Sequence, residues 1–165
     1  MTSTTEAPVT TQGYQVYIRA TPEAIWDAIT TSEWTERYGY QAPAEYDLRP
    51  GGAYRGLASE AMVAHGAPDV VVDGEVLEAD APRRLVQTWR ALWDTELVAE
   101  GFTRVTWEIE EGDGGVTKLT VSHELAGAPR TAALVAGAAA NAGGGWSYVL
   151  SELKTLLETG SSLAG

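Results

Sequence analysis

The sequence feature that most constrains the fold is a proline followed by two glycines, Pro50-Gly51-Gly52. Glycine accepts backbone angles that other residues resist, and a proline before it favours a tight turn. The segments 44–48 and 53–58 on its two sides have the pattern of short strands. They are therefore predicted to pair as a β-hairpin.

Further strand-like segments lie before and after this hairpin. Residues 14–18 show the two-residue period of a half-buried strand, with Tyr14, Val16 and Ile18 on one face. After the hairpin, residues 59–69 are expected to be a loop, and Ala81-Pro82 and Gly112-Asp113-Gly114-Gly115 are turn signals. The segments between them predict strands at 70–78, 85–89, 103–110 and 116–124. The sheet should therefore contain about six or seven antiparallel strands.

Two short helices are predicted between the first strand and the hairpin. Thr21 is a suitable N-cap, and Pro22 suits the first helical position because its missing N–H is not needed there. Ser32 is expected to cap the second helix, which should end near Gly39. The side chains expected on the buried face of the first helix are Ile25, Trp26 and Ile29.

The C-terminal part of the chain predicts a long amphipathic helix. Its apolar residues recur at three- and four-residue steps and are Trp146, Val149, Leu150, Leu153 and Leu157. The preceding Gly143-Gly144-Gly145 is unfavourable inside a helix, at roughly 1 kcal/mol per glycine relative to alanine. These glycines either break the helix or permit a close backbone approach. Helices segregated from strands define an α+β fold.

Length and composition favour one globular domain. The chain has 165 residues, enough for a sizeable core, and no internal repeat is visible. Residues 13–159 are expected to form the domain, with a disordered N-terminal tail at 1–12 and a flexible end at 160–165. The N-terminus lacks the features of a secretory signal, and no apolar run is long enough to span a bilayer, so a cytoplasmic protein is expected.

The charges and the missing cysteines exclude several kinds of site. The net charge of −12 disfavours nucleic-acid binding, which needs a basic surface. Without cysteine there is no disulfide, thiolate metal site or cysteine nucleophile. The two histidines, His65 and His123, lack the spacing of a metal site, and His65 sits in a Gly/Pro-containing segment typical of a solvated loop. We expect no metal and no cofactor.

Four segments in this order resemble the START-like superfamily, also called SRPBCC or birch-pollen-allergen-like. They are Thr21-Pro22-Glu23-Ala24-Ile25-Trp26-Asp27-Ala28-Ile29, Leu48-Arg49-Pro50-Gly51-Gly52-Ala53-Tyr54-Arg55, Arg83-Arg84-Leu85-Val86-Gln87-Thr88-Trp89 and Gly145-Trp146-Ser147-Tyr148-Val149-Leu150. The branch that looks most similar is that of bacterial homologues of the activator of heat-shock-protein-90 ATPase. The resemblance covers residues 13–159. It implies a helix-grip fold, in which a curved antiparallel sheet wraps a long C-terminal helix and leaves a cavity between them.

Strand alternation predicts which side chains would line that cavity. Leu119, Val121 and His123 share one face of the last strand, and the strand before it turns Thr103 and Trp107 the same way. The full set of candidate ligand-binding residues is Trp34, Tyr38, Tyr54, Gln87, Trp89, Thr103, Trp107, His123 and Trp146. Apolar walls with a few placed polar groups are typical of small-molecule pockets. The alternative for each tryptophan is core packing, and for His123 a position at a strand end, hydrogen-bonded to backbone or half exposed.

Three functions follow from the residues and the resemblance. The first is binding of a small hydrophobic or aromatic molecule in the internal cavity. The second is a polyketide cyclase or aromatase-like enzyme, with His123 acting with Tyr54 or Gln87, although no decisive catalytic pair is visible. The third is a co-chaperone-like interaction module. The sequence resembles only the C-terminal-type domain of the activator. A homodimer stays open in all three cases.

Overall fold

The computed structural model describes residues 11–138 and 143–163, and its centre is one antiparallel sheet of seven strands. Their spatial order is β1-β7-β6-β5-β4-β3-β2, so β1 and β2 are the edges. The strands are β1 Thr11–Ile18, β2 Ala44–Tyr46, β3 Ala53–Leu57, β4 Val70–Asp80, β5 Arg84–Ala91, β6 Thr103–Glu111 and β7 Thr117–Glu124. The predicted number of strands and the antiparallel pairing are confirmed.

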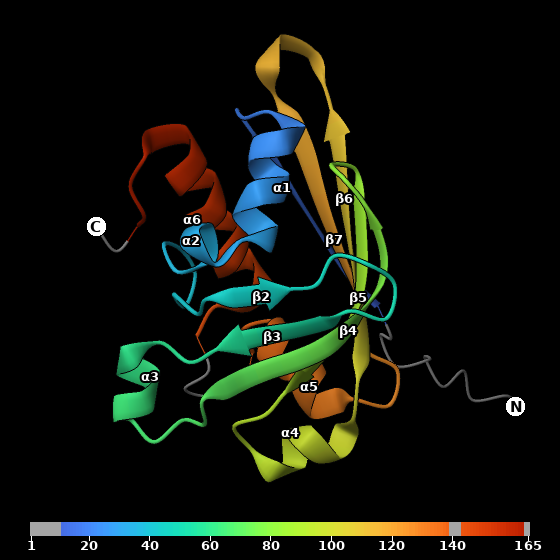
Figure 1. Ribbon diagram of the computed structural model, residues 1–165, viewed down its shortest axis with the longest axis vertical. Coiled ribbons are helices and arrows are strands. Elements are labelled where there is room, and N and C mark those ends of the chain that lie inside the picture. The colour runs from blue at the N-terminus through green and yellow to red at the C-terminus, as the bar shows by residue number, and fades with distance from the viewer. Residues whose placement is uncertain (1–10, 139–142, 164–165) are drawn as a thin grey trace, which may run out of the picture.

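Six helices are found among the described residues, and two of them are long enough to pack across the sheet. They are α1 Pro22–Thr30, α2 Ser32–Thr35, α3 Glu60–Ala64, α4 Thr95–Glu100, α5 Pro129–Val135 and α6 Gly145–Thr159, with a 3₁₀ turn at Asp113–Gly115. Figure 1 shows α1 and α6 on the same side of the sheet, and α4 and α5 at one end of the molecule. A curved antiparallel sheet closed by a C-terminal helix is the helix-grip fold, as predicted.

The local signals around α1 and the hairpin are confirmed. The Ala24 backbone N–H donates to Thr21 Oγ1 at 3.1 Å, so Thr21 is the N-cap, and Pro22 occupies the first turn. Strands β2 and β3 pair around the Pro50-Gly51-Gly52 turn, with Tyr46 opposite Tyr54. The turn chemistry therefore fixes which residues of the hairpin face each other.

The second short helix differs from its prediction. Thr31 holds the N-cap position, Ser32 is the first helical residue, and the helix ends at Thr35. Tyr38 lies beyond it, and its buried hydroxyl donates to the Ala28 carbonyl oxygen at 2.8 Å. Tyr38 is thus held by a tertiary hydrogen bond to α1, a contact that the local sequence pattern does not show.

Short helices account for the other differences. The predicted loop 59–69 contains α3, which begins where Ser59 Oγ accepts a hydrogen bond from the Met62 N–H at 3.2 Å. Helix α4 lies in a segment where no helix is predicted, and Asp94 caps it by accepting from the Glu96 N–H at 2.8 Å. Helices of five or six residues are too short to show a helical period in the sequence.

Gly145 is the first residue of α6, after the break that separates it from α5. Its φ of +65° is rarely adopted by other residues, and a Cβ at this position would collide with the Val135 carbonyl oxygen. Both alternatives for the glycine run are therefore realised here, since the helix is interrupted and the backbones approach closely. Part of the connection, 139–142, lies outside the described residues, as does most of the predicted tail. The predicted domain limits remain a prediction, with β1 beginning at Thr11.

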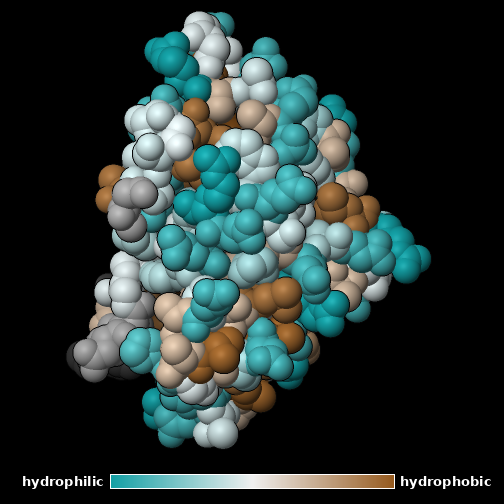
Figure 2. All heavy atoms as spheres, turned by 60° about the vertical axis from the view of Figure 1, so that its left-hand side comes forward, coloured by the Kyte–Doolittle hydropathy of each residue, from teal (hydrophilic) through white to brown (hydrophobic). Residues whose placement is uncertain are grey.

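The main core lies between the sheet, α1 and α6. It contains fully buried residues such as Ile18, Ile25, Leu119 and Leu153. A smaller cluster around Tyr54 and Val72 lies under the β2–β4 end. On the outside, Figure 2 shows hydrophobic residues in small groups among mostly hydrophilic ones. In the described parts of the chain, no helix is long and apolar enough to cross a membrane.

Candidate functional site

Buried polar and aromatic side chains meet where β5, β6 and β7 pack against α6. Strand register explains their meeting, because Trp89 pairs with Thr103 and Val105 pairs with His123 across neighbouring strands. We call this group the interior cluster, and its members are Tyr46, Tyr54, Gln87, Trp89, Thr103, Trp107, His123 and Trp146. Seven of these eight are among the nine residues predicted from the sequence.

His123 is the centre of one hydrogen-bonded chain through the interior cluster. Its Nδ1 accepts from the indole N–H of Trp146 at 3.1 Å, and its Nε2 lies 2.7 Å from Thr103 Oγ1. Thr103 Oγ1 in turn donates to the Trp89 carbonyl oxygen at 2.9 Å. The chain therefore connects α6 to three neighbouring strands.

This chain determines the protonation state of His123. The single hydroxyl hydrogen of Thr103 is used on Trp89, so the hydroxyl oxygen must accept from Nε2–H. The indole of Trp146 can only donate, so Nδ1 must be unprotonated. The imidazole is therefore neutral with its proton on Nε2. Burial lowers the pKa of His123 from 6.5 to about 4, in agreement with this arrangement.

Gln87 is the centre of a second set of hydrogen bonds. Its Oε1 accepts from the Tyr46 hydroxyl at 2.7 Å and from the Trp107 indole N–H at 3.1 Å. Because an indole only donates, the oxygen of the amide must face Trp107. The described hydrogen bonds of Gln87 all reach Oε1, so its amide N–H groups are the donors available to a ligand.

Aromatic rings surround these polar groups. Trp107 and Trp146 meet edge to face with centroids 5.2 Å apart, and Trp89 meets His123 in the same way at 5.4 Å. Tyr46 and Tyr54 stack with centroids 4.6 Å apart. Burial raises the pKa of both tyrosines well above the usual value, so their hydroxyls stay protonated. The interior cluster thus carries no net charge at neutral pH.

Sequence reasoning missed Tyr46. The available signal was the hairpin turn, because the register around Pro50-Gly51-Gly52 places Tyr46 opposite Tyr54. Two predicted residues lie outside the interior cluster. Tyr38 is buried with its hydroxyl on the Ala28 carbonyl oxygen, and Trp34 is half-buried with the Arg37 guanidinium 4.7 Å above its ring.

Two hollows among the described residues lie away from the interior cluster. One, of about 350 Å³, lies between β1 and α6 and is lined by Gly13, Tyr14, Gln15, Val16, Ser147, Leu150 and Ser151. A second, of about 100 Å³, lies beside the start of α1 and the β6–β7 turn. None of the nine predicted residues lines either hollow. In the interior cluster itself, the aromatic rings contact one another.

Neither metal binding nor acid–base chemistry by histidine is supported among the described residues. Residues 11–138 and 143–163 contain no group of three or more histidine, aspartate or glutamate side chains that could hold a metal ion. His65 is exposed at the end of α3. His123 uses both ring nitrogens in hydrogen bonds, so neither is available to a substrate in this conformation.

A helix-grip sheet with a buried aromatic and polar interior defines a START-like protein. A family model described as "Activator of Hsp90 ATPase homolog 1-like protein" matches residues 19–158. The chain belongs to this family. The resemblance inferred from the four sequence segments is therefore confirmed. No curated protein matches the chain.

Solved structures share the fold at low sequence identity. Protein MLL2253 from Mesorhizobium loti has a TM-score of 0.67 and 20% identity, covering 90% of this chain and 96% of that one. An HSP90 activator from Plasmodium falciparum has a TM-score of 0.54 and 23% identity, covering 70% and 72%. DynU16, a putative protein in the dynemicin biosynthetic locus, has a TM-score of 0.65 and 22% identity, covering 94% of this chain and 49% of DynU16. This chain therefore spans about half the length of DynU16.

Proposed function

We propose that the protein binds a small, uncharged, hydrophobic or aromatic molecule at the interior cluster, between the sheet and α6. The observation that carries this proposal is the presence of two hydrogen-bonded sets, one around His123 and one around Gln87, among indole and phenol rings. Gln87 is 1% exposed and His123 is fully buried. Burying such groups is unfavourable unless they are hydrogen-bonded, and an apolar core would avoid that requirement.

The chemistry of the interior cluster selects the class of ligand. The rings offer flat apolar faces, and Gln87 offers amide N–H donors to a carbonyl or hydroxyl oxygen. No cation lies in the cluster to balance a carboxylate or phosphate, and an unpaired buried charge is strongly unfavourable. A neutral aromatic ketone or phenol fits this description.

Ligand entry requires a change in the interior cluster, because its rings contact one another. Trp146 is the side chain best placed to move, since it comes from α6 and not from the sheet, and directly follows the helix break at Gly145. Its departure would cost one hydrogen bond to His123, about 1 kcal/mol. A ligand that supplies equal ring contact can offset that cost.

The enzyme and co-chaperone alternatives have weaker support. An acid–base role for His123 conflicts with its two occupied nitrogens and its pKa of about 4. DynU16 is described as a putative protein in the dynemicin biosynthetic locus. That description agrees with a small-molecule role and names no reaction. The co-chaperone alternative depends on the family name and on no contact within the interior cluster.

Titration with prodan, an uncharged naphthyl ketone whose emission depends on polarity, tests the proposal. Binding should be saturable with a blue-shifted emission, and Gln87→Leu should weaken it by about tenfold through the lost amide donors. Trp146→Ala should tighten binding by vacating the space of an indole. Trp93→Ala is the matched control, because Trp93 is 45% exposed. If prodan does not bind, or if Gln87→Leu and Trp146→Ala bind it as the control does, the proposal is wrong.

A further inference from the structure

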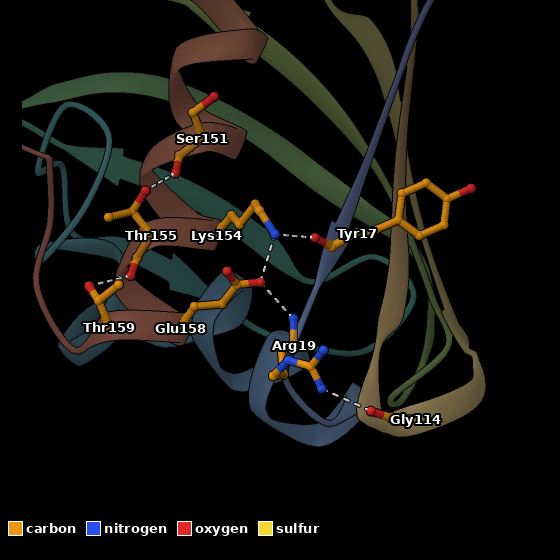
Figure 3. Close-up of polar contacts among 8 residues, drawn as sticks. All are labelled: Tyr17, Arg19, Gly114, Ser151, Lys154, Thr155, Glu158 and Thr159. Atoms are coloured by element: carbon orange, nitrogen blue, oxygen red, sulfur yellow. Dashed lines mark hydrogen bonds and ion pairs between the residues drawn. The ribbon is translucent and has the colours of Figure 1, made fainter.

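The second half of helix α6 is fastened to the sheet by charged side chains. Lys154 Nζ donates to the Tyr17 carbonyl oxygen at 2.7 Å, and Glu158 Oε2 accepts from the Arg19 N–H at 2.8 Å (Figure 3). Lys154 and Glu158 also pair with each other at 2.7 Å. Displacement of this half of the helix would therefore break several polar contacts at once.

The first half of α6 has fewer attachments. Among the described residues, two hydrogen bonds join positions 145–151 to other elements, and both lie in the first turn. The Gly145 N–H donates to the Tyr40 hydroxyl oxygen at 3.1 Å, and the Trp146 indole N–H donates to His123. The hollow of about 350 Å³ lies between this half of the helix and β1. A segment with few contacts opens at a lower free energy than the rest of a protein.

The start of α6 lacks the usual N-cap. The first N–H groups of a helix have no partner inside the helix, and the N-cap here is Gly144, which has no side chain to accept from them. The Tyr40 hydroxyl supplies an acceptor from 105 positions earlier in the chain. Gly143 and Gly145 have φ of +74° and +65°. Because glycine changes its backbone angles at low cost, these two residues can absorb a movement of the turn.

Tyr40 is itself held in position by its neighbours. The buried hydroxyl of Tyr38 is bonded to α1, and the Gln41 N–H donates to the Tyr38 carbonyl oxygen at 3.0 Å. Gln41 has a φ of +60°, which residues other than glycine seldom adopt, so the contacts of this segment hold a strained conformation. The rings of Tyr40 and Tyr148 lie with centroids 5.5 Å apart. Tyr40 is 41% exposed, so its hydroxyl can exchange its protein partner for water.

We propose that the first turn of α6 is the entrance to the interior cluster, and that Tyr40 is a positioning residue that holds this entrance closed. The inference rests on the proposed function, because it names the route by which a ligand reaches the same site. When the bond between Tyr40 and Gly145 breaks, the turn opens and carries the Trp146 indole away from His123. The second half of the helix stays in place through Lys154 and Glu158.

Hydrogen exchange measured by NMR without any ligand tests the role of Tyr40. Tyr40→Phe removes only the hydroxyl, so the first turn should open more often and the Trp146 indole N–H should exchange about fivefold faster. This signal is decisive because the substitution does not touch the bond from Trp146 to His123. The backbone amides of Leu153 and Leu156, in the second half of α6, should keep their rates.

Tyr17→Phe is the matched control for the exchange experiment. Tyr17 is 57% exposed, and among the described residues it is the carbonyl oxygen of Tyr17, not its hydroxyl, that is hydrogen-bonded. This variant should exchange as the wild type does. Unchanged exchange of the Trp146 indole in Tyr40→Phe would overturn the proposal. Equal acceleration at Leu153 and Leu156 would overturn it as well, because the whole protein and not one turn would then be opening.

Stopped-flow binding of prodan separates this inference from the proposed function. Tyr40→Phe should raise the association rate of prodan by about fivefold, because the open form is more populated. Normal binding with an unchanged association rate would overturn the entrance and leave the binding function intact. If prodan does not bind, the binding proposal fails, and exchange of the Trp146 indole still decides whether Tyr40 holds the turn closed.

Discussion

Trp146 donates its indole N–H to Nδ1 of His123 at 3.1 Å, and this bond joins α6 to the last strand of the sheet. The bond requires a neutral imidazole, so the attachment of the helix depends on the protonation of His123.

The first prediction concerns the pH dependence of stability. The folded-state pKa of His123 is about 4 and the unfolded value is 6.5, so the unfolded chain binds the proton more readily. The contribution of the neutral His123 to the free energy of unfolding is therefore complete above pH 6.5. It is lost as the pH falls from 6.5 toward 4. At the extreme it amounts to roughly 3 kcal/mol. Urea unfolding at a series of pH values measures it.

The control for this experiment is His123→Gln. Its free energy of unfolding should change less between pH 6.5 and pH 4 than that of the wild type, because the titrating group is gone. An identical pH profile for the two proteins would contradict the assignment of the effect to His123.

The second prediction concerns Trp146→Phe. Phenylalanine keeps much of the ring contact with Trp107 and leaves Nδ1 of His123 without its donor, so the free energy of unfolding should fall by about 1–3 kcal/mol. The pKa of His123 should rise, because the competing donor at Nδ1 is removed. Chemical denaturation and a histidine NMR titration measure the two effects. Trp93→Phe, at an exposed position, should change neither.

The third prediction concerns Gly145, the first residue of α6. Gly145→Ala should destabilise the protein by at least about 2 kcal/mol, because it adds a backbone collision to the strain of a positive φ. Gly114→Ala is a matched control, with a φ of +68° and no atom within 4 Å of a new Cβ. It should cost about 1 kcal/mol. Equal thermal stability of the two variants would show that the close approach to Val135 is unimportant.

The fourth prediction concerns the hydrogen bond from Tyr46 to Gln87. Tyr46→Phe should cost about 1 kcal/mol, and a double-mutant cycle with Gln87→Leu should give a coupling energy of at least about 0.5 kcal/mol. Trp107 also donates to Gln87, so Gln87→Leu alone should cost more than Tyr46→Phe. Additive effects in the cycle would argue against a direct bond in solution.

Sequence patterns that involve only adjacent residues, such as turn signals and strand alternation, predicted the strands well. The turn residues at Pro50-Gly51-Gly52 specified the hairpin, and strand alternation turned Thr103, Trp107 and His123 inward, as found. Short helices such as α3 and α4 are determined by single capping bonds and by tertiary contacts. Their few residues cannot show a periodic pattern, so the sequence did not predict them.

The contacts inside the interior cluster could be predicted only in part. Alternation placed Gln87 and His123 on inner faces, but a partner such as Tyr46 depends on how two distant strands twist and meet. Whether aromatic rings enclose a cavity or fill it depends on their orientations and summed volumes. Neither quantity can be obtained from the period of a sequence.

The neutral imidazole buried beside Trp146 has a practical consequence. The protein has two histidines, one inside the interior cluster and one exposed at the end of α3. Their ring ¹⁵N resonances should therefore form a built-in pair of reporters, one sensing the interior and the other the solvent. Any molecule that displaces the indole from Nδ1 would shift one signal and leave its companion unchanged, with no label attached.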